Sequence, residues 1–134
     1  MLVERVLRGL VAAGLLGSAW VHLSVWLDWA RDTAVVGPLF LVNVVAGVVI
    51  AVAVVVSRHP LSALAAVGFG VATLAAYVLS LTVGFFGVHE RFATRAELWG
   101  VITEAACVVF GLVLLTPTLR RGRHRVDPAA GDRP

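Results

Sequence analysis

The chain has 134 residues, of which 60% are hydrophobic and only 14% are charged. A soluble domain carries about a quarter charged residues, so this composition indicates a protein partly surrounded by lipid. The formal net charge is only +3, and the 11 basic residues are all arginines, placed mostly at the ends of apolar stretches. A basic face with interleaved aromatic side chains is missing, so we expect no nucleic-acid partner. The single cysteine excludes an intramolecular disulfide and a paired-cysteine metal site.

Four apolar stretches are each long enough to cross a membrane as a helix. About 20 apolar residues span the roughly 30 Å hydrocarbon core, and open strands would leave backbone groups unsatisfied in lipid. The predicted helices cover residues 6–27, 38–56, 61–87 and 95–116. We therefore expect an all-α fold, a transmembrane four-helix bundle with short loops over residues 1–119, followed by a basic tail over 120–134.

Local signals support these helix boundaries. Pro38 and Pro60 suit the first position of a helix, where a missing N–H costs nothing, and His59 suits the N-cap of the third helix. Residues 94–97, Thr-Arg-Ala-Glu, have the spacing of a capping box. Pro117 is expected to end or kink the fourth helix, because proline lacks the N–H that a helix interior requires.

The distribution of arginines predicts the orientation. The connection at 57–59 is so short that the second and third helices are antiparallel neighbours, and both termini share its side. That side carries Arg5, Arg8, Arg58, Arg120, Arg121, Arg123, Arg125 and Arg133, and the other carries Arg31, Arg91 and Arg95. Since cytoplasmic loops are enriched in basic residues, we expect a plasma-membrane protein with both termini in the cytoplasm. Four tryptophans suit the opposite membrane–water interface: Trp20, Trp26, Trp29 and Trp99.

Three of the spans each carry one polar residue at a similar depth. His22, Asn43 and Glu104 lie about 9–10 Å inside the predicted outer ends of their helices, from the rise of an α-helix. Ionisable groups inside a membrane are expensive and often functional. We expect these three side chains to form a polar site in the outer half of the bundle, roofed by His89 and Glu90 at the outer boundary.

Several chemistries suit this set of residues. Imidazole nitrogens and carboxylate oxygens bind divalent transition metals, which makes His22, Glu104, His89 and Glu90 possible metal ligands. Buried histidine and glutamate also suit a proton relay. In the simplest alternative, Glu104 pairs with His22 and this contact only stabilises the packing of the helices. In another alternative, Glu104 faces a partner protein. No phosphate loop or nucleophile–base pair is evident, so no particular cofactor is predicted and an enzyme is the least supported class.

Two ridges of small residues recur at four-residue spacing. The first helix carries Gly9, Ala13 and Gly17, and the third carries Gly68, Ala72, Ala76, Ser80 and Gly84. Helices associate in lipid through close backbone approach, so the longer ridge is expected to be an interface. Its partner is either another helix of this chain or a second protein.

The arginines after the last span form a cluster. Arg120, Arg121, Arg123 and Arg125 are expected to contact anionic lipid headgroups, at about 1 kcal/mol each. The rest of the tail is rich in Pro, Gly, Ala and Asp and is expected to be disordered. An orientation signal alone would also explain this cluster.

Three segments of the sequence are HLSVWLDWARD, VGPLFLVNVVAGVV and LTVGFFGVHERF. In these segments the chain resembles small, uncharacterised four-helix membrane proteins of actinobacterial type. The resemblance covers nearly the whole chain up to the arginine tail. His22, Asn43, His89 and Glu90 lie in these segments. The resemblance implies the four-helix fold and brings no activity with it.

Two functional classes remain. We expect first a structural or accessory subunit, which packs into a larger membrane assembly or a homo-oligomer through its small-residue ridges. The alternative is a membrane protein that binds a metal, protons or a small ligand in the outer polar layer. Bound metal or another ligand in the isolated chain would favour the second class.

Overall fold

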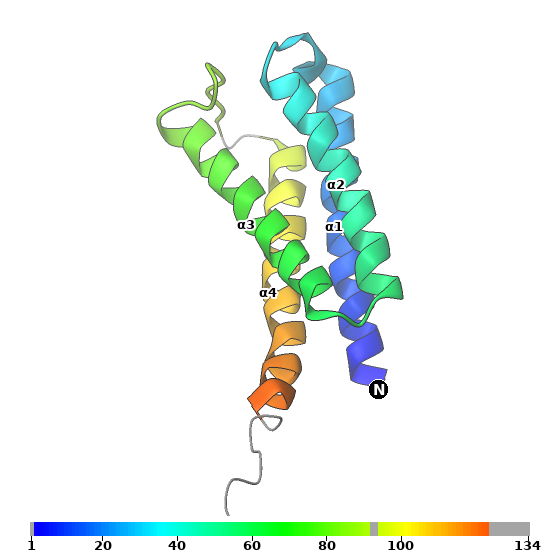
Figure 1. The fold of residues 1–134 in the computed structure, drawn as a ribbon. Coiled ribbons are helices and arrows are strands. Elements are labelled where there is room, and N and C mark those ends of the chain that lie inside the picture. The colour runs from blue at the N-terminus through cyan, green and yellow to red at the C-terminus, as the bar shows by residue number, and fades with distance from the viewer. Residues whose placement is uncertain (1, 92–93, 124–134) are drawn as a thin grey trace, which may run out of the picture.

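The computed structural model describes residues 2–91 and 94–123, with the side chains of the last helix up to Thr116. Its elements are α1 (Leu2–Asp28), the short 3₁₀ helix η1 (Ala30–Asp32), α2 (Val36–Val56), α3 (Pro60–Thr82) and α4 (Arg95–Arg123). Figure 1 shows a four-helix bundle, and the described ranges form no strand, so the predicted all-α fold is confirmed. The arginines expected to contact headgroups, Arg120, Arg121, Arg123 and Arg125, lie outside the described side chains.

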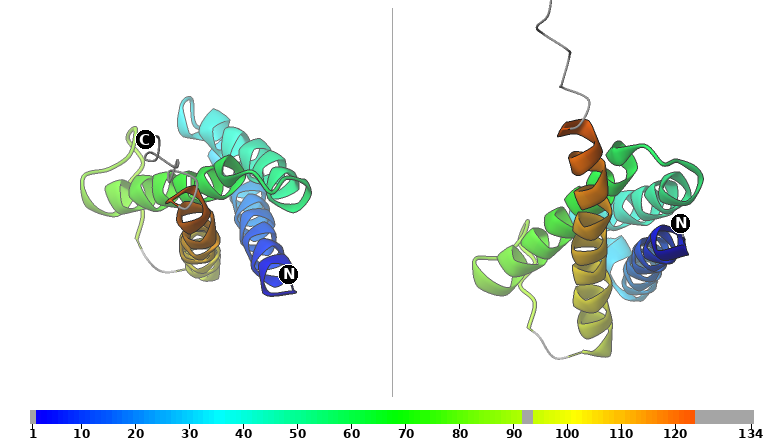
Figure 2. Two further views of the ribbon diagram at one scale, coloured as in Figure 1. Left: turned by 60° about the horizontal axis from the view of Figure 1, so that its bottom comes forward. Right: turned by 90° about the horizontal axis from the view of Figure 1, so that it is seen from below.

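The bundle is closely packed along three of its helix pairs. α1 packs along both α2 and α4, and α3 packs along α4, whereas α2 and α3 make far fewer contacts. Figures 1 and 2 show α3 tilted away from α2 toward the end that carries residues 29–35 and 83–91. We call this the distal end. The N-terminus, the α2–α3 connection and the last turns of α4 lie at the opposite end.

All four helices are long and apolar enough to cross a membrane. These candidate spans are Leu2–Asp28, Val36–Val56, Pro60–Thr82 and Arg95–Thr116. More than half of the surface of each of several α2 valines is exposed: Val42, Val45, Val49, Val52 and Val55. An apolar surface of this extent suits contact with lipid, so the four helices are compatible with a small multi-pass membrane protein.

Glycines allow the helix backbones to meet in a narrow core. A Cβ atom at Gly14 would lie 3.0 Å from the Thr103 carbonyl oxygen of α4, and one at Gly70 would lie 2.7 Å from the Glu104 carbonyl oxygen. Close backbone approach is the usual way in which helices associate in lipid. The largest fully buried side chains of the bundle are Val11, Leu15, Ser18, Val54 and Cys107.

The small-residue ridges predicted from the sequence are not the main helix interfaces within the chain. Gly9 and Ala13 are exposed, and Gly17 alone of that ridge packs against α4. Gly68 has no atom within 4 Å of its Cβ position, and the next three ridge residues of α3 line a cavity. The closest backbone contacts with α4 instead use Gly14 of α1 and Gly70 of α3, which lie outside both ridges.

α3 ends at Thr82, earlier than predicted. Gly84 has a φ angle of +87°, and its N–H donates to the Leu79 carbonyl at 2.9 Å. A glycine in the left-handed region commonly ends a helix, and the apolar character of the following residues concealed this signal. Gly87 is also left-handed, so residues 83–90 fold back over the distal end of α3.

α4 continues through Pro117 to Arg123, although the proline was expected to end or kink the helix. Proline at this position leaves the Val113 carbonyl without its usual backbone donor. The hydroxyl of Thr116 donates to that carbonyl at 2.7 Å. A side-chain hydrogen bond therefore replaces the missing backbone bond.

The predicted starts of α3 and α4 are confirmed, whereas α2 begins at Val36, so Pro38 is its third residue and not its first. The His59 ring nitrogen Nδ1 accepts from the Leu61 N–H at 3.3 Å, and Pro60 is the first residue of α3. At the start of α4, the Thr94 N–H donates to Glu97 Oε2 at 2.7 Å, and the Glu97 N–H donates to Thr94 Oγ1 at 3.4 Å. This reciprocal pair is a capping box.

Arg8 ties α1 to the end of α2. Its guanidinium donates to the carbonyl of Val54 at 2.7 Å and also to the carbonyl of Ser57. Glu4 holds the same guanidinium at 3.1 Å. The last carbonyls of a helix have no intrahelical donor, so this arginine acts as a cap supplied by another helix.

Arg8→Met is expected to lower the free energy of unfolding by about 1.5–3 kcal/mol, the typical contribution of hydrogen bonds to a charged group. Heat unfolding in a mild detergent measures this loss. Arg5→Met is the matched control, because Arg5 lies on the same helix, is exposed and carries the same charge. Equal losses in the two variants would contradict the capping role.

Candidate functional site

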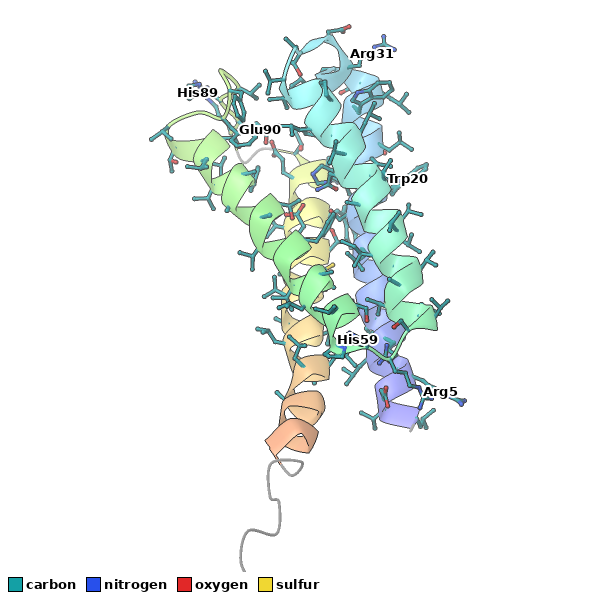
Figure 3. The ribbon with its side chains drawn as sticks, in the orientation of Figure 1. Arg5, Trp20, Arg31, His59, His89 and Glu90 are labelled. Atoms are coloured by element: carbon teal, nitrogen blue, oxygen red, sulfur yellow. The ribbon has the colours of Figure 1, made fainter. Side chains whose placement is uncertain are left out.

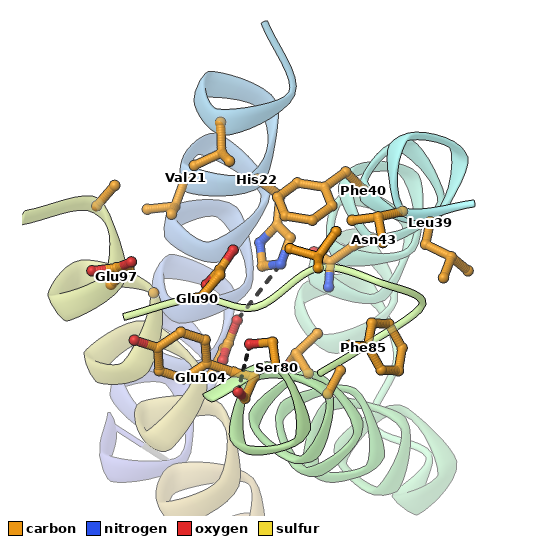
Figure 4. A pocket seen from close by; sticks show the side chains of 18 of the residues that line it. Val21, His22, Leu39, Phe40, Asn43, Ser80, Phe85, Glu90, Glu97 and Glu104 are labelled. Carbon is orange, nitrogen blue, oxygen red and sulfur yellow. Dashed lines mark hydrogen bonds and ion pairs between the residues drawn. The ribbon is translucent and has the colours of Figure 1, made fainter. Parts of the chain in front are cut away.

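A cavity of about 660 Å³ occupies the distal half of the bundle (Figure 4). All four helices and the segment 83–90 contribute to its lining, and it lies where α2 and α3 diverge. Its walls are mostly apolar. On the α3 side the small residues Ala72 and Ala76 leave room for it, so the predicted ridge forms a wall of the cavity.

A buried pair of polar side chains lies at the floor of the cavity. Glu104 is only 4% exposed, and its Oε1 lies 3.9 Å from His22 Nε2. The hydroxyl of Ser18, which is fully buried, donates to the same Oε1 at 3.3 Å. His22 Nδ1 lies 2.9 Å from the Ser18 carbonyl, so Nδ1 carries the proton and Nε2 faces the carboxyl group.

Aromatic rings form the wall beside this pair. The ring centroids of His22 and Phe40 are 5.0 Å apart, and those of Phe40 and Trp29 are 6.3 Å apart. Phe85, from the segment that folds back over α3, also lines the cavity. Aromatic faces of this kind bind apolar groups and cations.

Two polar atoms at the cavity wall have no hydrogen-bond partner within the described protein. They are Asn43 Oδ1 and the hydroxyl oxygen of Tyr77. Asn43 is only 9% exposed, and Figure 4 shows its side chain between those of His22 and Phe85. An unpaired buried polar group costs roughly 1–3 kcal/mol, and neither atom is open to the cavity, so both lower the stability of the fold.

Glu90 is held at the mouth of the cavity by its backbone. Its N–H donates to the Ser80 carbonyl at 3.1 Å, and reciprocal hydrogen bonds between Phe85 and Val88 close the turn that precedes it. The Glu90 side chain is half-buried and lines the cavity. Burial, together with the nearby charge of Glu97, raises the pKa of the Glu90 carboxyl.

His89 does not join the other predicted site residues. It is exposed, its ring packs over Gly84, and it does not line the cavity (Figure 3). Of the two residues predicted to roof the site, His89 and Glu90, only Glu90 therefore lies at the cavity. Among the described residues, no three His, Cys, Asp or Glu side chains are arranged to hold a metal ion, so the suggested ligands His22, Glu104, His89 and Glu90 do not converge.

The structure brings together four of the five candidate residues around one cavity: His22, Asn43, Glu104 and Glu90. Sequence reasoning missed Ser18, which links both members of the buried pair. The signal was present, because residues four apart on a helix face the same side and Ser18 precedes His22 by that spacing. The unpaired hydroxyl of Tyr77 had no signal in the sequence.

The described geometry thus combines a membrane-spanning bundle with a mostly apolar cavity and a few converging polar groups. Clefts of this composition are the common form of small-molecule sites. The sequence matches no protein-family model, no curated protein and no solved structure.

Proposed function

We propose that this protein binds a small amphipathic molecule in the distal cavity of its transmembrane bundle. The observation that carries the proposal is a cavity of about 660 Å³ whose mostly apolar walls enclose the buried Glu104–His22 pair. A site of that volume accommodates a molecule of drug-like size. A ligand with a polar end and an apolar body fits both kinds of wall.

Access to the cavity supports the same class of ligand. α2 and α3 pack sparsely where they border it, and the outer surfaces of both helices are apolar. A molecule that partitions into the bilayer therefore reaches the cavity between these helices without crossing a polar barrier. A ligand that is polar throughout, with no apolar body, would have to leave water first, at a high desolvation cost.

Filling the cavity tests the proposal directly. In Ala76→Phe, the added ring occupies the cavity, so saturable binding of a neutral solvent-sensitive dye such as Nile red is expected to disappear. Ala75→Phe is the matched control, because Ala75 is exposed and outside the lining. Fluorescence titration in a non-ionic detergent measures both. Equal binding by the two variants, or none by the wild type, would rule out a cavity site.

An accessory subunit is the second candidate. Gly9 and Ala13 are exposed on α1, and no atom lies within 4 Å of the Cβ position at Gly9. A second membrane protein could approach this stripe closely. Stoichiometric co-purification with another chain, lost in Gly9→Leu, would support it.

We also propose that both termini lie in the cytoplasm, with the distal end facing outward. The arginine excess at the terminal end supports this orientation. Cys107 is the only cysteine and is buried, so Cys107→Ala provides a background for single-cysteine labelling. A membrane-impermeant maleimide is expected to modify Thr33→Cys in intact cells and to leave Ser57→Cys unmodified. The reverse pattern would overturn the orientation.

A further inference from the structure

We infer that the ligand of the distal cavity is an organic cation, a protonated amine attached to an apolar body. This inference rests on the proposed function and adds the chemical class of the ligand. It follows from the charges, the hydrogen-bond acceptors and the rings that line the cavity.

The charged side chains that line the cavity are nearly all acidic. They are Asp28, Glu90, Glu97 and Glu104, and His22 is the one basic group among them. The described arginines of the distal end, Arg31, Arg91 and Arg95, are exposed and outside the lining. Low-dielectric walls strengthen the attraction of such carboxylates for a positive group, so an anionic ligand is disfavoured at the same site.

The polar groups of the lining select a ligand that donates hydrogen bonds. Ionised carboxylate oxygens only accept, and four of the side chains that line the cavity are carboxylates. An ammonium group offers several N–H donors and no acceptor, so it can donate to more than one of them. A carbonyl or ether group in the same place would find no donor among these carboxylates.

The size and the walls of the cavity favour a body of organic size over a bare metal ion. About 660 Å³ far exceeds the volume of an ion, and no three ligating side chains converge among the described residues. Trp29, Phe40 and Phe85 present rings at the cavity wall. Such rings attract both an apolar body and a nearby cation.

Three probes that differ only at one end test this class. Each carries the same dansyl fluorophore on the same short alkyl chain, which ends in an ammonium, a hydroxyl or a carboxylate group. Titration at neutral pH in a non-ionic detergent gives their affinities, and Ala76→Phe supplies the background from micelles. The ammonium probe is expected to bind roughly tenfold or more tightly than the hydroxyl probe, the effect of one charge-assisted hydrogen bond, and the carboxylate probe most weakly.

Removing one charge at a time distinguishes attraction by a carboxylate in the cavity from attraction by the overall charge of the protein surface. Glu90→Gln is expected to weaken the ammonium probe about tenfold and to leave the hydroxyl probe unchanged. Asp32→Asn removes the same charge from an exposed position at the same end, outside the cavity, and is expected to change neither. Equal weakening by the two variants would mean that the preference is a surface effect and would overturn the inference.

The outcomes distinguish the inference from the function on which it rests. If all three probes bind equally and Ala76→Phe blocks each of them, the cavity binds ligands but does not select cations. If no probe binds saturably to the wild type, the inference and the proposed function both fail.

Discussion

Gly70→Leu is expected to force α3 away from α4 and to lower the free energy of unfolding by about 3 kcal/mol or more. A Cβ atom at residue 70 would lie 2.7 Å from the Glu104 carbonyl oxygen and 2.8 Å from a methyl carbon of Val108. The first of these atoms belongs to a helix backbone and cannot rotate aside. Unfolding by heat or by denaturing detergent measures the loss.

Gly68→Leu is the matched control for this prediction. It adds the same side chain to the same helix two residues earlier, at a position with no atom within 4 Å. Its expected effect is within about 0.5 kcal/mol, the usual range for exposed substitutions. If Gly68→Leu destabilised the protein as much as Gly70→Leu, the α3–α4 contact would not be as described, and an interface along the Gly68 ridge would take its place.

Glu104→Gln is expected to keep the fold and to weaken binding of the ammonium probe by at least about tenfold, because a neutral amide replaces the carboxyl group at the floor of the cavity. The glutamine carbonyl can still accept from the Ser18 hydroxyl, and its amide can donate to His22 Nε2. The midpoint of heat unfolding should therefore stay within a few degrees of the wild type. Fluorescence titration and heat unfolding of the same sample measure the two effects.

Glu104→Leu separates the structural role of this residue from its role in binding. Leucine removes the carboxyl group that the buried Ser18 hydroxyl and His22 Nε2 face, at a cost of roughly 1–3 kcal/mol. If Glu104→Gln bound the probe as tightly as the wild type and only Glu104→Leu were destabilised, Glu104 would stabilise helix packing and would not be part of a binding site.

The fold was predictable because its cause lies in local composition. Spans of about 20 apolar residues, the proline at the start of α3 and the capping box before α4 each act over a few residues. The end of α3 was predicted too late, since Gly84 lies within an apolar stretch and its left-handed conformation is not visible in composition. The path of α4 through Pro117 depends on one hydroxyl, that of Thr116, which no periodic pattern indicates.

Only the depth of the candidate site within the helical spans was predictable from the sequence. Counting residues from the helix ends placed His22, Asn43 and Glu104 at one level, and the structure has all three around the cavity. Counting could not give the rotation of each helix, so Gly14 and Gly70 were missed as interface residues. It also could not show that His89 and Glu90, adjacent in sequence, point to different surroundings.

Native mass spectrometry of the chain, purified from its membrane in a mild detergent, tests the central claim most directly. We expect one small molecule per chain on the wild type and on Ala75→Phe, and none on Ala76→Phe, whose added ring takes its place in the cavity. A wild-type chain that carries a stoichiometric protein partner and no small molecule would contradict the claim and identify an accessory subunit instead.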